Sequence, residues 1–232
     1  MNIRVHKILI ESYANGPGKR NVVWLQGCTL QCPGCFNPLT HDPAEGKSIP
    51  IEQLLTELIK APCDGITISG GEPFQQPSAL LELLTLIREQ SSLPVLVFSG
   101  HSFPVLTDDP EYSICLPLID ALICGAYRQD LPPAYERFCS SANQELILLS
   151  DRYKKEDFEN LPLGEYIIDG EGNAVLSGIV PFHEAHRGLT SCGAKPTQAC
   201  LSPCASQAYL SPCASQASPS PCASPQYQLT CE

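Results

Sequence analysis

The feature that most constrains this chain is a short loop with three cysteines, Cys28, Cys32 and Cys35, at C-x3-C-x2-C spacing. An apolar run, Val22–Leu25, precedes the loop and predicts a strand that ends at Gly27. Three thiolates on one tight loop can converge on one metal centre, because the loop can curl around it. A 4Fe–4S cluster normally takes four thiolates. Three protein ligands would therefore leave one iron open.

The spacing of the last two cysteines allows two other interpretations. The stretch Cys32–Cys35 could be a thioredoxin-like redox pair, but such pairs open a helix in a βαβ unit and do not use a third cysteine four residues earlier. It could also be half of a zinc site, for which His41 is the nearest candidate for the fourth ligand. From the spacing alone, the iron–sulfur interpretation has these two competitors.

A second motif, Gly70–Pro73 (Gly-Gly-Glu-Pro), follows a predicted buried strand at Gly65–Ser69. Two glycines at the end of a strand let the backbone approach a ligand closely. The Glu72 carboxylate beside that backbone suits a cation. A glycine turn with a solvated glutamate is the simpler alternative. The motif is separated from the cysteine loop by one predicted helix, Ile51–Ile59, and that strand.

Together, the two motifs resemble the signature elements of the radical S-adenosylmethionine enzymes. The version Cys-Pro-Gly-Cys-aromatic-Asn-Pro resembles the small activating proteins of anaerobic ribonucleotide reductase, a group of glycyl-radical activases. Many members of the wider family carry an aromatic residue just before the third cysteine, where this chain has Gly34. This departure from the wider family restricts the resemblance to the small activating proteins. The resemblance covers about residues 1–182.

The resemblance implies the cofactors and the residues that hold them. A 4Fe–4S cluster with one open iron would be held by Cys28, Cys32 and Cys35. S-adenosyl-L-methionine would bind the open iron. Its implied contacts are Gly70, Gly71, Glu72, Pro73, Asn37 and Ser99. Glu72 would face the methionine ammonium group and Ser99 the ribose. No catalytic residue beyond the cluster ligands is implied.

The sequence predicts an α/β protein. A strand at Ile8–Tyr13, a helix at Ser78–Glu89 and a strand at Pro94–Ser99 extend the alternation already described. The resemblance implies a partial (β/α) barrel of the radical S-adenosylmethionine type, with the cofactor at the carboxyl ends of the strands. In the activases a later strand ends in an acidic residue, where this chain has Cys124. The segment Ser140–Gln144 resembles a Ser-Ser-Asn-Gln segment of the group, with one residue inserted.

The composition changes near Gly188, and we expect a domain over residues 1–187 and a low-complexity tail over 188–232. The tail has a nine-residue repeat rich in Cys, Ser and Pro, with cysteines at 204, 213, 222 and 231. Its apolar content is too low to offset the entropy of ordering, so it is predicted to be disordered. The exposed thiols could bind soft metals or exchange with a partner's thiols. A repeat expansion without a selected role is the simplest interpretation.

The overall composition excludes some classes. The chain has 232 residues, 43% of them hydrophobic, and a formal charge of −11, which argues against a nucleic-acid surface. We see no signal peptide and no transmembrane segment, so we expect no membrane association and a cytoplasmic location. The thirteen cysteines do not suggest a disulfide scaffold, because six crowd the tail and a working cluster loop needs free thiolates.

The resemblance implies reductive cleavage of S-adenosylmethionine to methionine and a 5′-deoxyadenosyl radical, which would generate a glycyl radical on a large partner such as an anaerobic ribonucleotide reductase. A flavodoxin or ferredoxin would supply the electron. One alternative is a radical enzyme acting on a small molecule, like the 7-carboxy-7-deazaguanine synthases. Another is a non-catalytic iron–sulfur or metal-binding protein.

Overall fold

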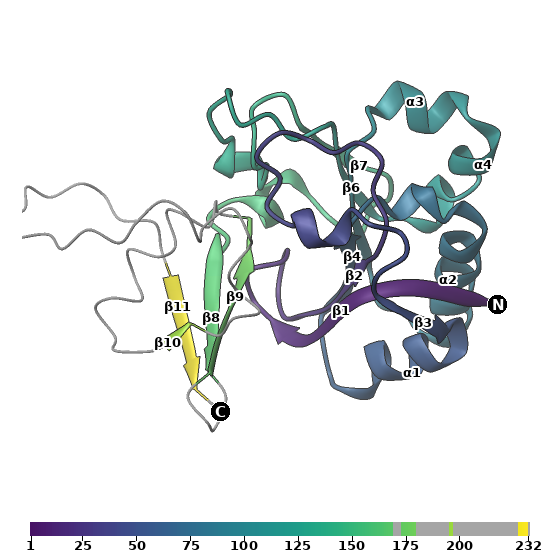
Figure 1. Cartoon of the computed structure of the whole chain (residues 1–232), viewed down its shortest axis with the longest axis horizontal. Helices are drawn as coiled ribbons and strands as arrows, with labels where there is room; N and C mark the ends of the chain where they lie inside the picture. Colours follow the sequence, from purple (N-terminus) through teal and green to yellow (C-terminus); the bar gives the residue numbers. More distant parts are fainter. Residues whose placement is uncertain (169–172, 180–194, 197–226, 232) are drawn as a thin grey trace, which may run out of the picture. The chain divides into compact units, whose positions relative to one another are not determined.

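The computed structural model describes residues 1–168, 173–179, 195–196 and 227–231, and it divides into two compact units, Met1–Leu161 and Pro162–Glu232 (Figure 1). The first unit carries both sequence motifs. Among the described residues, no helix combines the length and apolar character that crossing a bilayer requires.

The first unit is built on a seven-stranded sheet in the order β3-β1-β2-β4-β5-β6-β7. The strands are β1 (Asn2–Ser12), β2 (Arg20–Leu25), β3 (Lys47–Pro50), β4 (Gly65–Gly70), β5 (Val95–Ser99), β6 (Ala121–Cys124) and β7 (Glu145–Leu148). β2, β4, β5 and β6 run parallel, whereas β1, β3 and β7 pair antiparallel at the two ends. The parallel strands therefore bring their carboxyl ends to one edge of the sheet.

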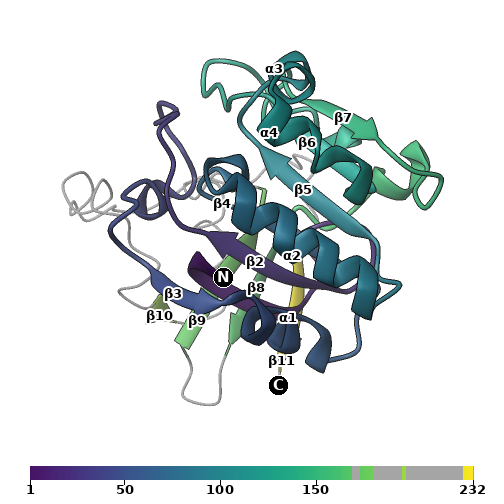
Figure 2. The same ribbon diagram turned by 90° about the vertical axis from the view of Figure 1, so that its right-hand side faces the viewer.

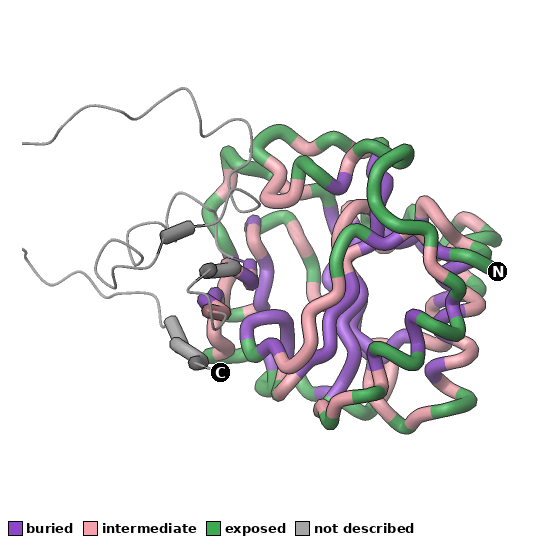
Figure 3. The backbone as a smooth tube through the Cα atoms, turned by 60° about the horizontal axis from the view of Figure 1, so that its bottom comes forward, coloured by how far each residue is buried: buried purple, intermediate pink, exposed green. Residues whose placement is uncertain are grey.

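Two helices, α1 (Ile51–Lys60) and α2 (Pro77–Gln90), cover one face of this sheet (Figure 2). Their apolar residues recur at helical spacing and are buried against the strands, which are themselves largely buried in Figure 3. The shorter helices are α3 (Phe103–Asp108), α4 (Pro110–Ser113), η1 (Pro38–Thr40), η2 (Pro73–Gln75), η3 (Leu116–Leu118), η4 (Tyr135–Arg137) and η5 (Lys155–Phe158). The predicted α/β class is confirmed.

The sequence missed two elements of the first unit. β3 is a short edge strand whose residues are mostly exposed, so no apolar pattern marks it in the sequence. α3 is a six-residue helix, too short to show a helical period. The strand predicted at Ile8–Tyr13 begins six residues earlier, at Asn2. Pro50 lies just before the first residue of α1.

A buried arginine ties the amino ends of the parallel strands together. Arg20 is fully buried, and burial lowers the pKa of its guanidinium. The guanidinium donates to Thr67 Oγ1 at 3.0 Å, to the Ile66 carbonyl at 2.6 Å and to Tyr153 Oη at 2.5 Å. A Cβ atom added at Gly65 would collide with Arg20 Nη1 and lie 2.7 Å from the Pro94 carbonyl. The absence of a side chain at Gly65 makes room for the cation.

We therefore expect Gly65→Ala to lower the free energy of unfolding by about 1–3 kcal/mol, the usual cost of overpacking a closed interior. Urea denaturation followed by circular dichroism measures this change. Glu57→Ala, on the exposed face of α1, is the control and should stay near wild type. If Gly65→Ala were as stable as the control, the Arg20 side chain would be able to adopt another conformation at no cost in stability, which would contradict this prediction.

The second unit contains a four-stranded sheet in the order β10-β9-β8-β11. β8 (Gly164–Ile168) pairs antiparallel with β9 (Asn173–Gly178). β10 (Lys195–Pro196) and β11 (Tyr227–Cys231) are two short strands within the predicted tail, and they pair parallel with β9 and β8. The rest of the tail and the predicted boundary at 187/188 lie outside the described residues, so the disorder stays a prediction.

Candidate functional site

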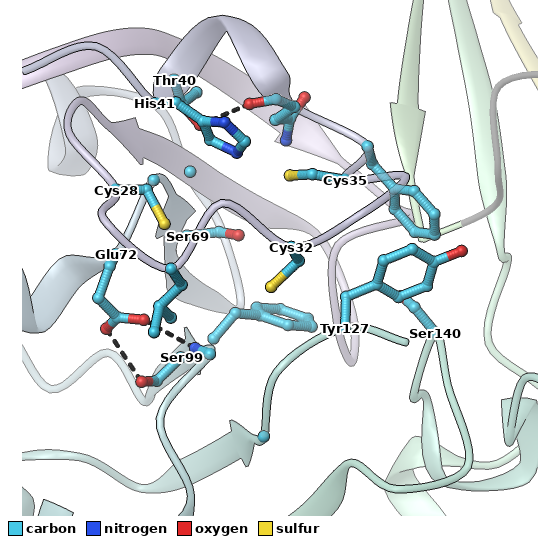
Figure 4. A pocket seen from close by; sticks show the side chains of 18 of the residues that line it. Cys28, Cys32, Cys35, Thr40, His41, Ser69, Glu72, Ser99, Tyr127 and Ser140 are labelled. Atoms are coloured by element: carbon cyan, nitrogen blue, oxygen red, sulfur yellow. Dashed lines mark hydrogen bonds between the residues drawn. The ribbon is translucent and has the colours of Figure 1, made fainter. Parts of the chain in front are cut away.

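A pocket lies at the carboxyl ends of the parallel strands of the first unit (Figure 4). The sequence-predicted site residues that line it are Cys28, Cys32, Cys35, Asn37, Gly70, Gly71, Glu72 and Ser99. Pro73 is not part of the lining; it is buried and begins η2. The structure thus brings together residues from three separate stretches of sequence, as expected if parallel strands gather their ends at one edge.

The cysteine loop is curled by backbone in the left-handed region just before each cysteine. Gly27 precedes Cys28 with φ of 101°, Gln31 precedes Cys32 with φ of 46°, and Gly34 precedes Cys35 with φ of 72°. Glycine adopts this region without strain. Gln31 is a non-glycine exception, and such residues often lie at functional sites. The three reversals bring all three side chains into the lining of one pocket.

Nearby backbone groups favour the thiolate form of two of the cysteines. The backbone groups of Leu30 and Gln31 lower the pKa of the Cys28 thiol, and that of Asn37 lowers the pKa of the Cys35 thiol. Burial raises the pKa of both thiols, and these backbone groups act in the opposite direction. A bound iron cation would favour the thiolates further. The loop therefore carries backbone groups that favour the thiolates a cluster needs.

The described side chains do not gather in the way that a single metal ion requires. Within the described residues, no group of three or more His, Cys, Asp or Glu side chains lies close enough to hold one metal ion. Zinc would require four such donors around one point. A four-iron cluster binds each thiolate to a different iron, so its sulfurs stand further apart. The described geometry thus gives no support to the zinc alternative.

The Gly-Gly-Glu-Pro motif is hydrogen-bonded to the start of the cysteine loop. Gly70 is in register with Leu25 across the parallel pair β2–β4. Gly71 N donates to the Leu25 carbonyl, and Glu72 N donates to the Gly27 carbonyl, each at 2.8 Å. A Cβ atom at Gly71 would collide with the Gly27 carbonyl. Glycine is therefore required for the two motifs to meet.

Glu72 places a buried carboxylate in this pocket, with only 1% of its surface exposed. Its Oε1 accepts from Phe74 N at 3.0 Å and from Ser99 Oγ at 2.9 Å, and its Oε2 accepts from Gly100 N at 2.7 Å. Burial raises the pKa of the Glu72 carboxyl despite these donors. In the described residues it has no ion-pair partner. Such a carboxylate is suited to a cationic ligand.

Comparisons with known proteins bear on the chemistry of this pocket. A family described as "4Fe-4S single cluster domain" matches residues 14–147, which include the cysteine loop and the Gly-Gly-Glu-Pro motif. The chain belongs to this family. The family supports a 4Fe–4S cluster as the cofactor of this chain.

Relatives of the chain are activating proteins. It is 37% identical over 106 residues to the pyruvate formate-lyase-activating enzyme of Clostridium pasteurianum, covering 43% of this chain and 44% of that enzyme. It is 30% identical over 138 residues to the anaerobic ribonucleoside-triphosphate reductase-activating protein of Vibrio cholerae, covering 56% and 88%. The phage T4 protein of the same name is 27% identical over 151 residues, covering 62% and 94%.

The chain spans less than half the length of the pyruvate formate-lyase-activating enzyme that it matches, but most of the length of the reductase-activating proteins. Both groups of relatives confirm the resemblance to glycyl-radical activases that the two motifs indicated. The match to the Vibrio cholerae protein extends the similarity well beyond the cysteine loop.

The structure shows the surroundings of two residues that the sequence singled out at the ends of β5 and β6. Ser99, expected beside a ribose, donates its hydroxyl to Glu72 and so positions the carboxylate. Cys124, which replaces the usual acid, is buried, and burial raises the pKa of its thiol to about 11. It does not line the pocket, whereas the neighbouring Gly125 does.

Several lining residues were not predicted as site residues; among them are Thr40, His41, Tyr127, Ser140 and Gln144. A signal existed for Gln144, because the resemblance included Ser140–Gln144. Gln144 donates to the Gly125 carbonyl at 3.0 Å and accepts from Ser140 N at 2.9 Å. It joins that segment to the end of β6. His41 was considered only as a zinc ligand.

Proposed function

We propose that this chain is a radical S-adenosylmethionine activase that generates a glycyl radical on a partner protein. The observation that carries the proposal is the single pocket that joins three loop thiols to the buried carboxylate of Glu72. This arrangement suits a ligand whose ammonium group faces Glu72 and which also coordinates the open iron of the cluster. The activating-protein relatives support the same function.

In this proposal Cys28, Cys32 and Cys35 hold a 4Fe–4S cluster, and S-adenosyl-L-methionine binds at its fourth iron. When bound, the pair supplies one-electron reductive cleavage of the sulfonium C–S bond, with the electron from an external donor such as a flavodoxin or ferredoxin. The chain's own groups bind and orient: Glu72 attracts the ammonium, and the glycine backbone of β4 approaches the ligand closely. Asn37 and Ser99 remain proposed as parts of this binding site.

The sheet topology supports a partial (β/α) barrel of the radical S-adenosylmethionine type within a domain over residues 1–187. Four parallel strands with intervening helices present their carboxyl ends to the ligand, as in barrels. The proposed substrate is a backbone glycine of a large protein. An anaerobic ribonucleotide reductase is favoured as the partner, since the reductase-activating relatives are matched over nearly their full length.

The test is anaerobic. The full chain is reconstituted with iron and sulfide, reduced with dithionite and given S-adenosylmethionine, and 5′-deoxyadenosine is measured by chromatography. We expect product above that of the protein without iron. A well-formed cluster with no product, even after an anaerobic reductase is added, would contradict the activity and favour a non-catalytic iron–sulfur protein.

We also expect residues 190–232 to be dispensable for this chemistry. All residues that line the pocket lie within Met1–Leu161, so deleting the tail removes no ligand. Iron content and 5′-deoxyadenosine formation should both stay within about twofold of the full chain, a difference of less than 0.5 kcal/mol. Loss of iron from the truncated protein would show that the tail, including β10 and β11, takes part in cluster binding or folding.

A further inference from the structure

His41 lines the same pocket as the three cysteines, and one of its ring nitrogens lacks a partner. The Nε2 atom is closed off from solvent and has no hydrogen-bond partner in the part of the chain that the structure describes. Figure 4 shows the ring turned toward the space that the cysteine side chains also face. A buried polar atom without a partner is rare in native proteins, and an absent ligand is one common explanation.

The backbone fixes this ring relative to the first cysteine. Cys28 N donates to the His41 carbonyl at 3.0 Å, and Gly27 N donates to the Thr40 carbonyl at 2.7 Å. The segment that bears His41 therefore runs beside the entry to the cysteine loop. These two hydrogen bonds hold the backbone of His41 beside that of Cys28.

A buried glutamine supports the turn from both sides. Gln26 donates from Nε2 to the Leu39 carbonyl at 2.9 Å and to the Asp42 carbonyl at 2.8 Å, which flank Thr40 and His41. Its Oε1 lies 2.9 Å from His6 Nδ1, outside the pocket. A turn fixed at both ends presents the ring in one orientation, which is what a contact to a small buried group requires.

We infer that His41 donates a hydrogen bond from Nε2 to a sulfur atom of the 4Fe–4S cluster. The inference rests on the proposed function, because it needs the cluster. Both the neutral Nε2–H tautomer and the imidazolium can donate. Cluster sulfurs are the acceptors that the pocket would offer, and hydrogen bonds to them set the reduction potential. The bond stabilises the reduced cluster, which carries one more negative charge, and so makes the cluster easier to reduce.

The test measures the reduction potential of the cluster by EPR-monitored titration, first without and then with S-adenosylmethionine, in wild type, His41→Ala and His41→Gln. The expected values are those without S-adenosylmethionine. We expect His41→Ala to bind a cluster whose ratio of reduced to oxidised form, at a fixed potential, is about tenfold lower. That is a shift of about 59 mV to more negative potential. His41→Gln keeps a donor and should recover part of the shift. His6→Ala is the control, since it removes an imidazole from the same Gln26 outside the pocket.

Each outcome separates this inference from the proposed function. Wild type without a cluster would overturn the proposed function itself. A wild-type cluster with an unchanged potential in His41→Ala would overturn only the role of His41. A shift seen only when S-adenosylmethionine is present would assign His41 to the cofactor and overturn the cluster contact. Two results would make His41 an iron ligand and so overturn the proposed hydrogen bond. One is loss of the cluster in both His41 variants while their melting curves stay native. The other is strong nitrogen coupling in pulsed EPR.

Discussion

Cys32→Ala should abolish the cluster and the cleavage of S-adenosylmethionine together. Cys32 lies between the other two cysteines of the loop, and its side chain lines the pocket (Figure 4). Removing it leaves two thiolates, which can hold only two irons of a cubane cluster. We expect iron to fall from about four atoms per chain in wild type to near background. Formation of 5′-deoxyadenosine should fall to the level of the protein without iron.

The matched control is Cys63→Ala. Cys63 is a half-buried free cysteine of the same unit that does not line the pocket. It should keep wild-type iron content, absorbance and product formation. Since both variants lose one thiol, a difference between them reports the position of the thiol and not the number of thiols. Cofactor cleavage retained in Cys32→Ala would contradict the ligand assignment.

The meeting of the two motifs could be predicted from sequence because it depends on local patterns and one pairing rule. Apolar runs before the cysteine loop and before Gly70 indicated two buried strands, now β2 and β4. Consecutive parallel strands usually lie side by side with their carboxyl ends at one edge. The resemblance implied that the Glu72 carboxylate and the cysteines share one site, and this pairing rule agrees with that expectation.

Other features of the site could not be predicted because they depend on contacts distant in sequence. The left-handed backbone of Gln31 has no signature in its residue type, unlike that of the two loop glycines. The bond from Ser99 to Glu72 arises only when β5 lies beside β4. The role of Gln26 depends on a turn more than ten residues later. The antiparallel edge strand β3 is likewise fixed by pairing with β1 and not by its own polar sequence.

Glu72→Gln should weaken binding of S-adenosylmethionine with little change in the cluster. The wild-type carboxylate is buried without an ion-pair partner among the described side chains, and the cofactor's ammonium would supply one. Loss of a hydrogen bond to a charged group costs about 1.5–3 kcal/mol, so we expect affinity to fall roughly 10- to 100-fold. Equilibrium dialysis on the reconstituted protein measures this, and cleavage at low cofactor concentration should fall in parallel.

The same substitution should also reduce stability, because the amide cannot accept everywhere the carboxylate does. Oε1 and Oε2 both accept from donors, and in glutamine one of these positions becomes an NH₂ that faces an N–H or O–H group. The expected loss is about 1–3 kcal/mol. Glu52→Gln, exposed on α1, controls for the loss of one charge. A Glu72→Gln protein with wild-type cofactor affinity would remove Glu72 from the ammonium site and leave it a structural acceptor at the ends of β4 and β5.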